Sequence, residues 1–515
     1  MLVLEISLQK ASKDNRQVMK QKNKFVLSID QGTTSSRAII FDDNGNALSK
    51  AQKEIKQIYP MDGWVEHDPE EIWRNTLAVC RAAISRCNSD IGAIGITNQR
   101  ETVVLWERKT GKPLFNAIVW QDRRTVKTCA QLRDQNLGRI IQERTGLLLD
   151  PYFTATKLCW LLDHVKNARK RAENSELAAG TIDSFLLWRL TDGRIHATDA
   201  TNASRTLLFN IHTQEWDSDL MRIFRIPDSI LPEVKDSADD YGYSSAHLLG
   251  SSIPILGVAG DQHAALIGQA CVRTGMVKST YGSGGFALLN TGTQALTSKH
   301  GLLTTLSYRI EGKAHYALEG SIFNAGTAIQ WLQDGLGLIE SAAETDTYAK
   351  TSTDSSGVIF VPAFTGLGAP HWDPHARGSI YGLTRNSSPA DLVRAALESI
   401  GYQSAELLDV LITDGDTDIS TLRVDGGMAQ NDWMLQFLSD ITGINVERSR
   451  TIETTALGAS HLANLGTGAL NSIADLTNLW KLDKQFSPQI SSTKRKFLLS
   501  NWARAIQSTR SFAPN

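Results

Sequence analysis

Residues 25–41 read FVLSIDQGTTSSRAIIF, two apolar runs joined by a turn of glycine and hydroxyl residues. The short first run, the turn-rich middle and the immediate second run predict two strands in a tight hairpin. A partial echo, MVKSTYGSGGFALLN, occupies residues 276–290, where Gly282-Ser283 matches Gly32-Thr33. Two such hairpins, about half a chain apart, indicate a duplicated domain with one copy in each half, although a pair this short also arises by chance.

Strand-like and helix-like segments alternate from Phe25 to about Gly466, with no Gly/Ser-rich or Pro-rich linker between the halves. This alternation predicts an α/β fold, and 515 residues exceed one ordinary core, so we expect two large domains. The sequence predicts helix starts at Asp68, which precedes Pro69, and at Ser388, which precedes Pro389. A capping side chain followed by proline suits the first turn of a helix.

The composition limits the class of partner. The chain has 53 Lys+Arg against 55 Asp+Glu, so no basic excess suggests nucleic acid and a small-molecule partner is favoured.

The five cysteines form no C-x-x-C, which argues against structural zinc and disulfides and fits a reducing compartment. No apolar run reaches the roughly 18 residues of a membrane span, so we expect a cytoplasmic protein. Residues 1–24 are predicted to be a flexible extension, with a weak organelle signal as the alternative.

The first turn carries the chemistry of a phosphate site. Gly32 lets backbone N–H groups approach an anion, Thr33, Thr34 and Ser35 add hydroxyl donors, and Arg37 adds a permanent charge. The plain alternative is an ordinary polar hairpin turn. Asp30 would repel a phosphate and therefore suits a Mg²⁺ ligand, directly or through water.

Two further glycine turns lie in the second half. YGSGGF, residues 281–286, begins a degenerate G-x-G-x-x-A, but the strand-like FALLNTG that follows disfavours a dinucleotide-binding loop and favours a second phosphate-facing turn. No G-x-x-x-x-G-K-[ST] occurs, which excludes a P-loop. In LRVDGGMAQNDW, residues 422–433, Gly427 offers bare backbone to a ligand, and Asn431 either caps the next helix or touches the ligand.

Other residues suit a polyol. Arg100 beside Glu101 provides donors and acceptors for neighbouring hydroxyls, with a salt-bridged surface turn as the alternative. Trp120 and Tyr152 are aromatic residues that can line a carbon skeleton, although single aromatic residues are more often core. Asp261, in GVAGDQHAALIG, residues 257–268, lies among small apolar neighbours, and its carboxylate is a helix cap, a catalytic base or a metal ligand.

Together these segments resemble the carbohydrate kinases that share the actin-like ATPase fold, and within them the glycerol kinases. The resemblance runs from about Phe25 to about Gly468 and is most specific in three motifs: GWVEHDP, ITNQRETVVLW and TDATNASRT. It implies two duplicated actin-like ATPase (ribonuclease H-like) domains, residues 25–268 for glycerol and phosphate and 269–515 for the nucleotide, with a nucleotide cleft between them. It further implies transfer of the ATP γ-phosphate, with Mg²⁺, to a terminal hydroxyl of glycerol, which gives sn-glycerol 3-phosphate and ADP.

The resemblance also assigns residues. The glycerol set is Arg100, Glu101, Trp120, Tyr152, Asp261, Gln262 and Phe286, with Asp261 as the catalytic base. The nucleotide set is Thr33, Thr34, Ser35, Arg37, Ser283, Gly326, Gln330, Gly427 and Asn431. The metal set is Asp30 and Asp261.

The sequence departs from the family at two site positions, with Ser283 in place of threonine and His263 in place of glutamine. The glycine-rich loop through which some members bind fructose 1,6-bisphosphate is not evident in residues 241–255. His247 falls near a histidine that the phosphotransferase system phosphorylates in some members, but a plain surface histidine is the favoured interpretation.

We expect a homodimer or homotetramer. The alternatives to glycerol kinase activity are a kinase for another polyol or sugar, and a non-catalytic ATP-binding module.

Overall fold

The computed structural model describes residues 25–87, 89–352 and 357–512, so the predicted extension at residues 1–24 lies outside the described residues. The chain divides into two compact units. Unit 1 takes the chain up to Val272, together with Thr305–Tyr316 and Thr454–Leu479. Unit 2 takes Arg273–Thr304, Ala317–Glu453 and the chain from Trp480.

The opening hairpin is the middle of the unit 1 sheet. This five-stranded sheet has the order β13-β5-β1-β2-β3. Its strands are β1 (Phe25–Gln31), β2 (Ser35–Phe41), β3 (Ala47–Glu54), β5 (Ile91–Asn98) and β13 (Ile255–Gly260). β1 pairs antiparallel with β2, with Asp30 opposite Arg37, and parallel with β5, which pairs parallel with β13. The predicted hairpin is therefore confirmed.

A seven-stranded sheet, order β16-β17-β15-β14-β20-β21-β22, contains the second copy. Its strands are β14 (Val277–Tyr281), β15 (Gly285–Gly292), β16 (Leu303–Ile310), β17 (Lys313–Ile322), β20 (Thr421–Asp425), β21 (Asn445–Ser449) and β22 (Leu482–Phe486). The β14–β15 hairpin is antiparallel, and β14, β20 and β21 are parallel neighbours. The run β21-β20-β14-β15-β17 therefore repeats the order β13-β5-β1-β2-β3, which confirms the duplication. Because β15 follows the glycines of YGSGGF, the dinucleotide-loop interpretation is excluded.

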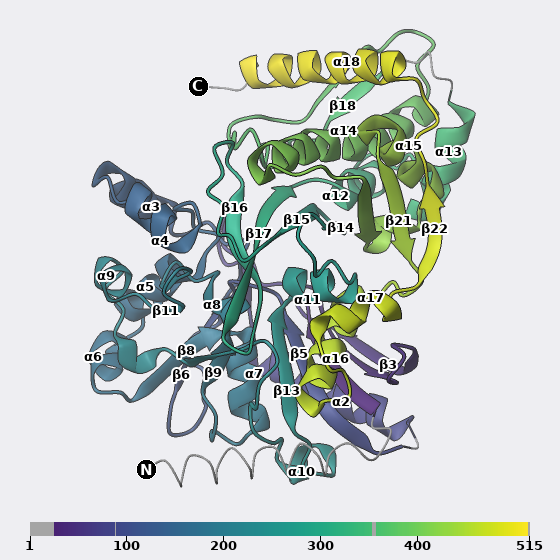
Figure 1. Cartoon of the computed structure of the whole chain (residues 1–515). Helices are drawn as coiled ribbons and strands as arrows, with labels where there is room; N and C mark the ends of the chain where they lie inside the picture. Colours follow the sequence, from purple (N-terminus) through teal and green to yellow (C-terminus); the bar gives the residue numbers. More distant parts are fainter. Residues whose placement is uncertain (1–24, 88, 353–356, 513–515) are drawn as a thin grey trace. The chain divides into compact units, whose positions relative to one another are not determined.

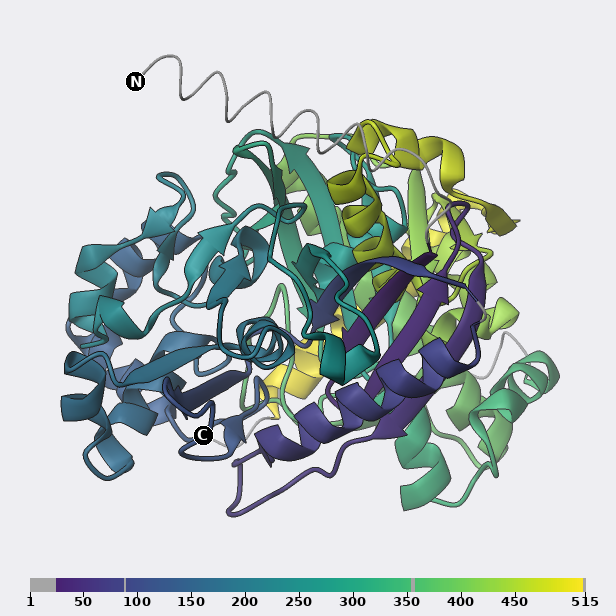
Figure 2. The same ribbon diagram turned by 90° about the horizontal axis from the view of Figure 1, so that it is seen from below.

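Helices cover both faces of the unit 1 sheet. α2 (Pro69–Ser85), capped by Asp68, lies along β2 and β3, as Figure 2 shows for the indigo helix beside the purple strands. Strand alternation sends Leu27 and Ile29 into the cluster with α2, whereas Ser28 on the opposite face donates to the Ala456 carbonyl of α16 (Thr454–Thr467) at 2.6 Å. α16 packs on β13, β5 and β1, and on α11 (Asp261–Gly268) (Figure 1).

Glycines set the distance between α11 and α16. A Cβ on Gly458 would lie 1.8 Å from the Ala264 carbonyl oxygen, and one on Gly268 would lie 2.0 Å from that of Thr454. Only residues without a side chain permit this approach, which holds α11 closely against α16.

The main helices of unit 2 are α14 (Pro389–Gly415), α15 (Asp432–Thr442) and α18 (Ser492–Ser511). α14 begins after Ser388 with a capping box, as its sequence predicted, and packs on α15. Val393, Leu397 and Ile400 of α14 join the largest core cluster of this unit.

The remaining helices and strands complete the two units. In unit 1 they are β4 (Glu66–His67), β6 (Val103–Glu107), β7 (Ala117–Ile118), α3 (Val126–Asp134), α4 (Gly138–Thr145), α5 (Thr154–His164), α6 (Ala168–Glu173), β8 (Leu177–Thr181), α7 (Ile182–Leu190), β9 (Ala197–Asp199), α8 (Ala200–Ala203), β10 (Phe209–Asn210), β11 (Glu215–Trp216), α9 (Ser218–Ile223), β12 (Glu233–Lys235), α10 (Ala246–Leu249) and α17 (Leu476–Leu479). In unit 2 they are α12 (Gly326–Gln330), α13 (Thr345–Thr351), β18 (Ile359–Val361) and β19 (Ser379–Tyr381). Among the described residues, no helix combines the length and apolar character that crossing a membrane requires.

Candidate active site

The predicted site residues of unit 1 follow the ends of parallel strands. Asp30 is near the end of β1, Arg100 and Glu101 follow β5, and Asp261 follows β13. Because β13, β5 and β1 are neighbours and parallel, their carboxyl ends meet at one edge of the sheet. Ligands of α/β sheets bind at such edges.

The β1–β2 turn is tight and polar. Gly32 N–H donates to the Ser35 carbonyl at 2.9 Å, which leaves Thr34 exposed and Thr33 partly exposed at the tip. Arg37 lies opposite Asp30, with Nη1 3.5 Å from Oδ2. The turn therefore groups the hydroxyls and the cation that the phosphate prediction requires.

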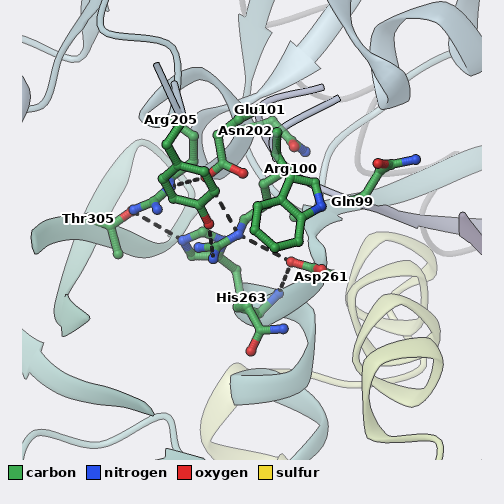
Figure 3. Close-up of polar contacts among 12 residues, drawn as sticks. Gln99, Arg100, Glu101, Asn202, Arg205, Asp261, His263 and Thr305 are labelled. Carbon is green, nitrogen blue, oxygen red and sulfur yellow. Dashed lines mark hydrogen bonds and ion pairs between the residues drawn. The ribbon is translucent and has the colours of Figure 1, made fainter. Parts of the chain in front are cut away.

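Arg100 is at the centre of the polar cluster. Its Nε lies 3.2 Å from Asp261 Oδ1 and 3.8 Å from Glu101 Oε1, and its Nη2 lies 3.5 Å from the Tyr152 hydroxyl. The Arg100 and Glu101 side chains are 2% and 1% exposed, whereas that of Asp261 is 31% exposed. Of these charged groups only Asp261 is substantially exposed, so it is the member that a substrate can reach. Figure 3 shows the contact between Arg100 and Asp261.

Asp261 is the first residue of α11. Its Oδ1 accepts from the Gln262 N–H at 2.7 Å, at the positive end of the helix dipole. Gln262 is buried, and the fully buried His263 has its Nε2 3.2 Å from Thr305 Oγ1. His263 is therefore buried two residues after Asp261, where its ring contacts Thr305 of the segment 305–316.

Glu101 has a left-handed backbone, with φ of 60°. The Thr102 N–H donates to the Arg100 carbonyl at 2.7 Å, so Glu101 is the middle residue of a three-residue turn. This conformation is costly for a residue with a side chain and is typical of functional sites. The sequence gives no signal that the backbone of a glutamate here is left-handed.

Aromatic side chains form one wall. The Trp120 indole N–H donates to Thr33 Oγ1 at 2.9 Å, and its ring meets Tyr152 edge to face at 5.5 Å between centroids. The structure thus brings the predicted polyol wall into contact with the predicted phosphate turn. Both rings are partly exposed, as a ligand wall requires.

Two buried residues behind this wall were not identified from the sequence. Lys157, in α5, donates from Nζ to the Tyr152 carbonyl at 2.7 Å, and burial lowers the pKa of Lys157 to about 7 despite nearby Glu101. The Arg205 Nε lies 2.6 Å from Glu101 Oε1, and both side chains are buried. Arg205 belongs to the TDATNASRT motif. Its pairing with Glu101 joins residues far apart in the sequence, which a local pattern does not predict.

His67 is the third residue that sequence reasoning missed. Its Nε2 lies 2.9 Å from Gln57 Oε1, and the Gln57 amide donates to the Thr33 carbonyl at 2.9 Å. On its other side, Nδ1 lies 3.3 Å from Gln99 Nε2. His67 therefore joins the phosphate turn to the segment that precedes Arg100.

We expect His67→Gln to reduce the acid sensitivity of the fold. Burial lowers the pKa of His67 from 6.5 to about 4, so the unfolded chain takes up the proton first as pH falls. Stability is therefore lost between pH 6.5 and 4, by up to about 3 kcal/mol from this group. Denaturant unfolding from pH 7 to pH 4 should show a smaller loss for the variant, and identical losses would contradict the assignment.

The predicted nucleotide residues of unit 2 gather at the ends of β14 and β20. The Gly326 N–H, at the start of α12, donates to the Gly282 carbonyl at 2.9 Å, and a Cβ on Gly326 would lie 2.7 Å from that oxygen. Ser283 and Gly427 are exposed at neighbouring turns, and Gln330 is exposed at the end of α12. Asn431 caps α15 by accepting from the Met434 N–H at 2.8 Å. Phe286 is partly exposed on β15.

The acidic groups fit a metal carried by a substrate. In the part of the chain that the structure describes, no three His, Cys, Asp or Glu side chains form a metal cluster. Asp30 and Asp261 are single carboxylates at the carboxyl ends of β1 and β13. One or two carboxylates suit Mg²⁺ bound to a nucleotide, since that ion keeps several waters.

Two family profiles match the chain in succession. "FGGY family of carbohydrate kinases, N-terminal domain" matches residues 25–268, and the C-terminal domain of that family matches residues 277–467. The chain belongs to the FGGY family of carbohydrate kinases. The fold is accordingly the actin-like ATPase fold that the resemblance implied.

Relatives of this FGGY kinase are similar over nearly their whole length. A glycerol kinase of Rhodospirillum centenum is 56% identical over 95% of this chain and 99% of the relative. One of Alcanivorax borkumensis is 57% identical over 94% of this chain and 97% of the relative. The crystal structure of Plasmodium falciparum glycerol kinase with ADP superposes with a TM-score of 0.89 at 39% identity, covering 95% of this chain and 98% of that one. A gluconate kinase of Lactobacillus acidophilus, at 22% identity and a TM-score of 0.84, shares the fold.

Proposed function

We propose that this protein is an ATP-dependent glycerol kinase, which transfers the γ-phosphate of ATP to a terminal hydroxyl of glycerol and so begins glycerol breakdown. The observation that carries the proposal is the partly exposed Asp261, paired at 3.2 Å with a buried Arg100 that adjoins Glu101 and Tyr152. The glycerol kinases that are 56–57% identical over nearly full length support it.

Glycerol needs a site that both donates and accepts hydrogen bonds and covers three carbons. In our proposal Arg100 and Gln262 donate to the hydroxyls, Glu101 and Asp261 accept from them, and the Tyr152 hydroxyl does either. Trp120 shields the carbons, and Phe286 is assigned the same role.

ATP is the second substrate. Thr33, Thr34, Ser35 and Arg37 are assigned to its phosphates, since the tight β1–β2 turn exposes Thr34 and part of Thr33 and Arg37, whereas Ser35 is buried. A second set of residues is assigned to the same nucleotide: Ser283, Gly326, Gln330, Gly427 and Asn431. Mg²⁺, held by Asp30 and Asp261, would neutralise charge on the phosphates.

Phosphoryl transfer leaves positioning and charge stabilisation to the protein. Asp261 accepts the proton of the attacking hydroxyl as the new O–P bond forms, while Arg100 holds the carboxylate in place. Hydroxyls and N–H groups of the β1–β2 turn stabilise the transferred group. The ADP oxygen leaves on the side of phosphorus opposite the attacking hydroxyl. Water must be excluded from the attacking side, where it would compete with glycerol as acceptor.

Other assignments complete the proposal. We assign glycerol and phosphate binding to a domain of residues 25–268 and nucleotide binding to a domain of residues 269–515; the two family profiles cover residues 25–268 and 277–467. We place the enzyme in the cytoplasm as a homodimer or homotetramer. His247, exposed on α10 with Nδ1 3.8 Å from Asp192 Oδ2, is the residue at which phosphotransferase-system regulation would act, while a plain surface histidine stays the favoured interpretation.

An acceptor panel tests the activity. ADP release should be measured with Mg·ATP and glycerol, glyceraldehyde, a pentulose or a hexose, each at several concentrations. Glycerol is expected to give the highest kcat/KM. A higher value for a sugar would reassign the enzyme within the family, and no release with any acceptor would favour a non-catalytic ATP-binding module.

A further inference from the structure

Residues 199–206, DATNASRT, are buried and include none of the residues assigned to glycerol or ATP. We propose that this segment positions the acceptor site through two separate arms. Arg205 sets the Glu101 carboxylate, and Thr201 sets the backbone that presents Asp261. The inference rests on the proposed function, since it assigns positioning residues to that site.

The first arm is the Arg205–Glu101 pair. Nε of Arg205 lies 2.6 Å from Glu101 Oε1, and the two side chains are 0% and 1% exposed. The Arg205 guanidinium also lies 5.2 Å from the Phe153 ring centroid and 5.8 Å from that of Tyr152. A planar group held between a carboxylate and two rings fixes the Glu101 side chain in one orientation, whereas a lysine would provide only a point charge. The Glu101 backbone is left-handed, a costly conformation that persists only where surrounding contacts such as this pair hold it in place.

The second arm passes through Thr201. The Gly260 N–H, one residue before Asp261, donates to Thr201 Oγ1 at 3.0 Å. That hydroxyl donates in turn to Asp199 Oδ1 at 2.9 Å. The Thr201 side chain therefore fixes the last peptide of β13, from which α11 and Asp261 begin.

Asp199 joins this arm to β5. Its carboxylate accepts from the N–H groups of Thr201 and Asn202, both at 2.9 Å. The Asn202 amide exchanges two hydrogen bonds with Asn98, at 3.0 and 3.1 Å, and Asn98 ends β5 shortly before Arg100. One short segment thus holds the ends of both strands that supply Arg100, Glu101 and Asp261, and Figure 3 shows Asn202 and Arg205 beside these residues.

The two arms make separable predictions. Arg205→Lys should raise the glycerol KM about 10- to 100-fold with little change in kcat or in the ATP KM, because Glu101 is assigned to binding. Thr201→Val should lower kcat about tenfold with a near-normal glycerol KM, because the arm ends at the base. Thr201→Ser keeps the hydroxyl and should restore kcat.

Matched controls separate positioning from general stability. Arg309→Lys alters another arginine–carboxylate pair of the same geometry, Nε to Asp236 Oδ1 at 2.6 Å, whose side chains are partly buried, at 11% and 16% exposed. Thr191→Val removes a buried hydroxyl that accepts from the Ile195 N–H at 3.2 Å and donates to the Leu187 carbonyl at 2.8 Å. Both should lower Tm and leave kcat and the glycerol KM unchanged.

The inference is wrong if kcat and the glycerol KM change together in both test variants. It is also wrong if the controls show the same separate effects on kcat and on KM. If Arg205→Lys does not fold, the Thr201→Val and Thr201→Ser pair decides, since equal kcat values in the two would contradict the arm. Failure of the proposed function is distinct, because the wild type would then not phosphorylate glycerol. In that case the separate effects on kcat and on KM would be measured with the acceptor that the wild-type enzyme uses.

Discussion

Asp261→Asn is expected to lower kcat about 10²- to 10⁴-fold, the usual contribution of a general base. Asparagine keeps the size and one oxygen acceptor of the side chain but does not accept the hydroxyl proton. The fold and glycerol binding should persist, because Arg100 and Glu101 remain and a Gly260 N-cap already starts α11. The measurements are coupled ADP release and the rise in Tm that glycerol produces.

Asp219→Asn is the matched control for this variant. Asp219 lies in the first turn of α9 and pairs with Arg144 at 2.8 Å, away from the site residues of the β13 end. Its loss should leave kcat unchanged. Near-normal turnover of Asp261→Asn would remove the base assignment, whatever its effect on stability.

Arg100→Ala should raise the glycerol KM about 10- to 150-fold, the equivalent of a charge-assisted hydrogen bond of roughly 1.5–3 kcal/mol. The ATP KM should change little, because the Arg100 guanidinium faces Asp261 and Tyr152, both assigned to glycerol. Initial rates with each substrate varied in turn give both constants.

Arg100→Lys refines this test. It keeps the charge but loses the planar group that reaches Asp261 and Tyr152 together, so its glycerol KM should lie between wild type and Arg100→Ala. An equal rise of the glycerol and ATP KM values in Arg100→Ala would move Arg100 out of the acceptor pocket.

Local patterns predicted much of the fold. The β1–β2 and β14–β15 hairpins, the caps at Asp68 and Ser388, and the strand after YGSGGF are all as expected, because each depends on neighbours in sequence. Asn431 proved to be a helix cap, one of its two predicted roles. The ligand contacts of the nucleotide residues stay predictions.

The supporting residues of the site were not predictable in the same way. Glu101 gives no local signal for a left-handed backbone, and Arg205 meets it only because the 199–206 segment folds against the end of β5. Trp120 was expected as a wall, but its hydrogen bond to Thr33 depends on tertiary packing. His263, unusual in sequence, is explained in part, since its ring fills buried space and reaches Thr305.

The most direct measurement is the fate of the γ-phosphate. Enzyme, Mg·ATP and glycerol should be followed by phosphorus NMR, with the product tested as a substrate for a dehydrogenase specific for sn-glycerol 3-phosphate. We expect ADP and a single phosphate ester on a terminal carbon of glycerol, in equal amounts. Inorganic phosphate in place of the ester, or an ester on the middle carbon, would contradict it.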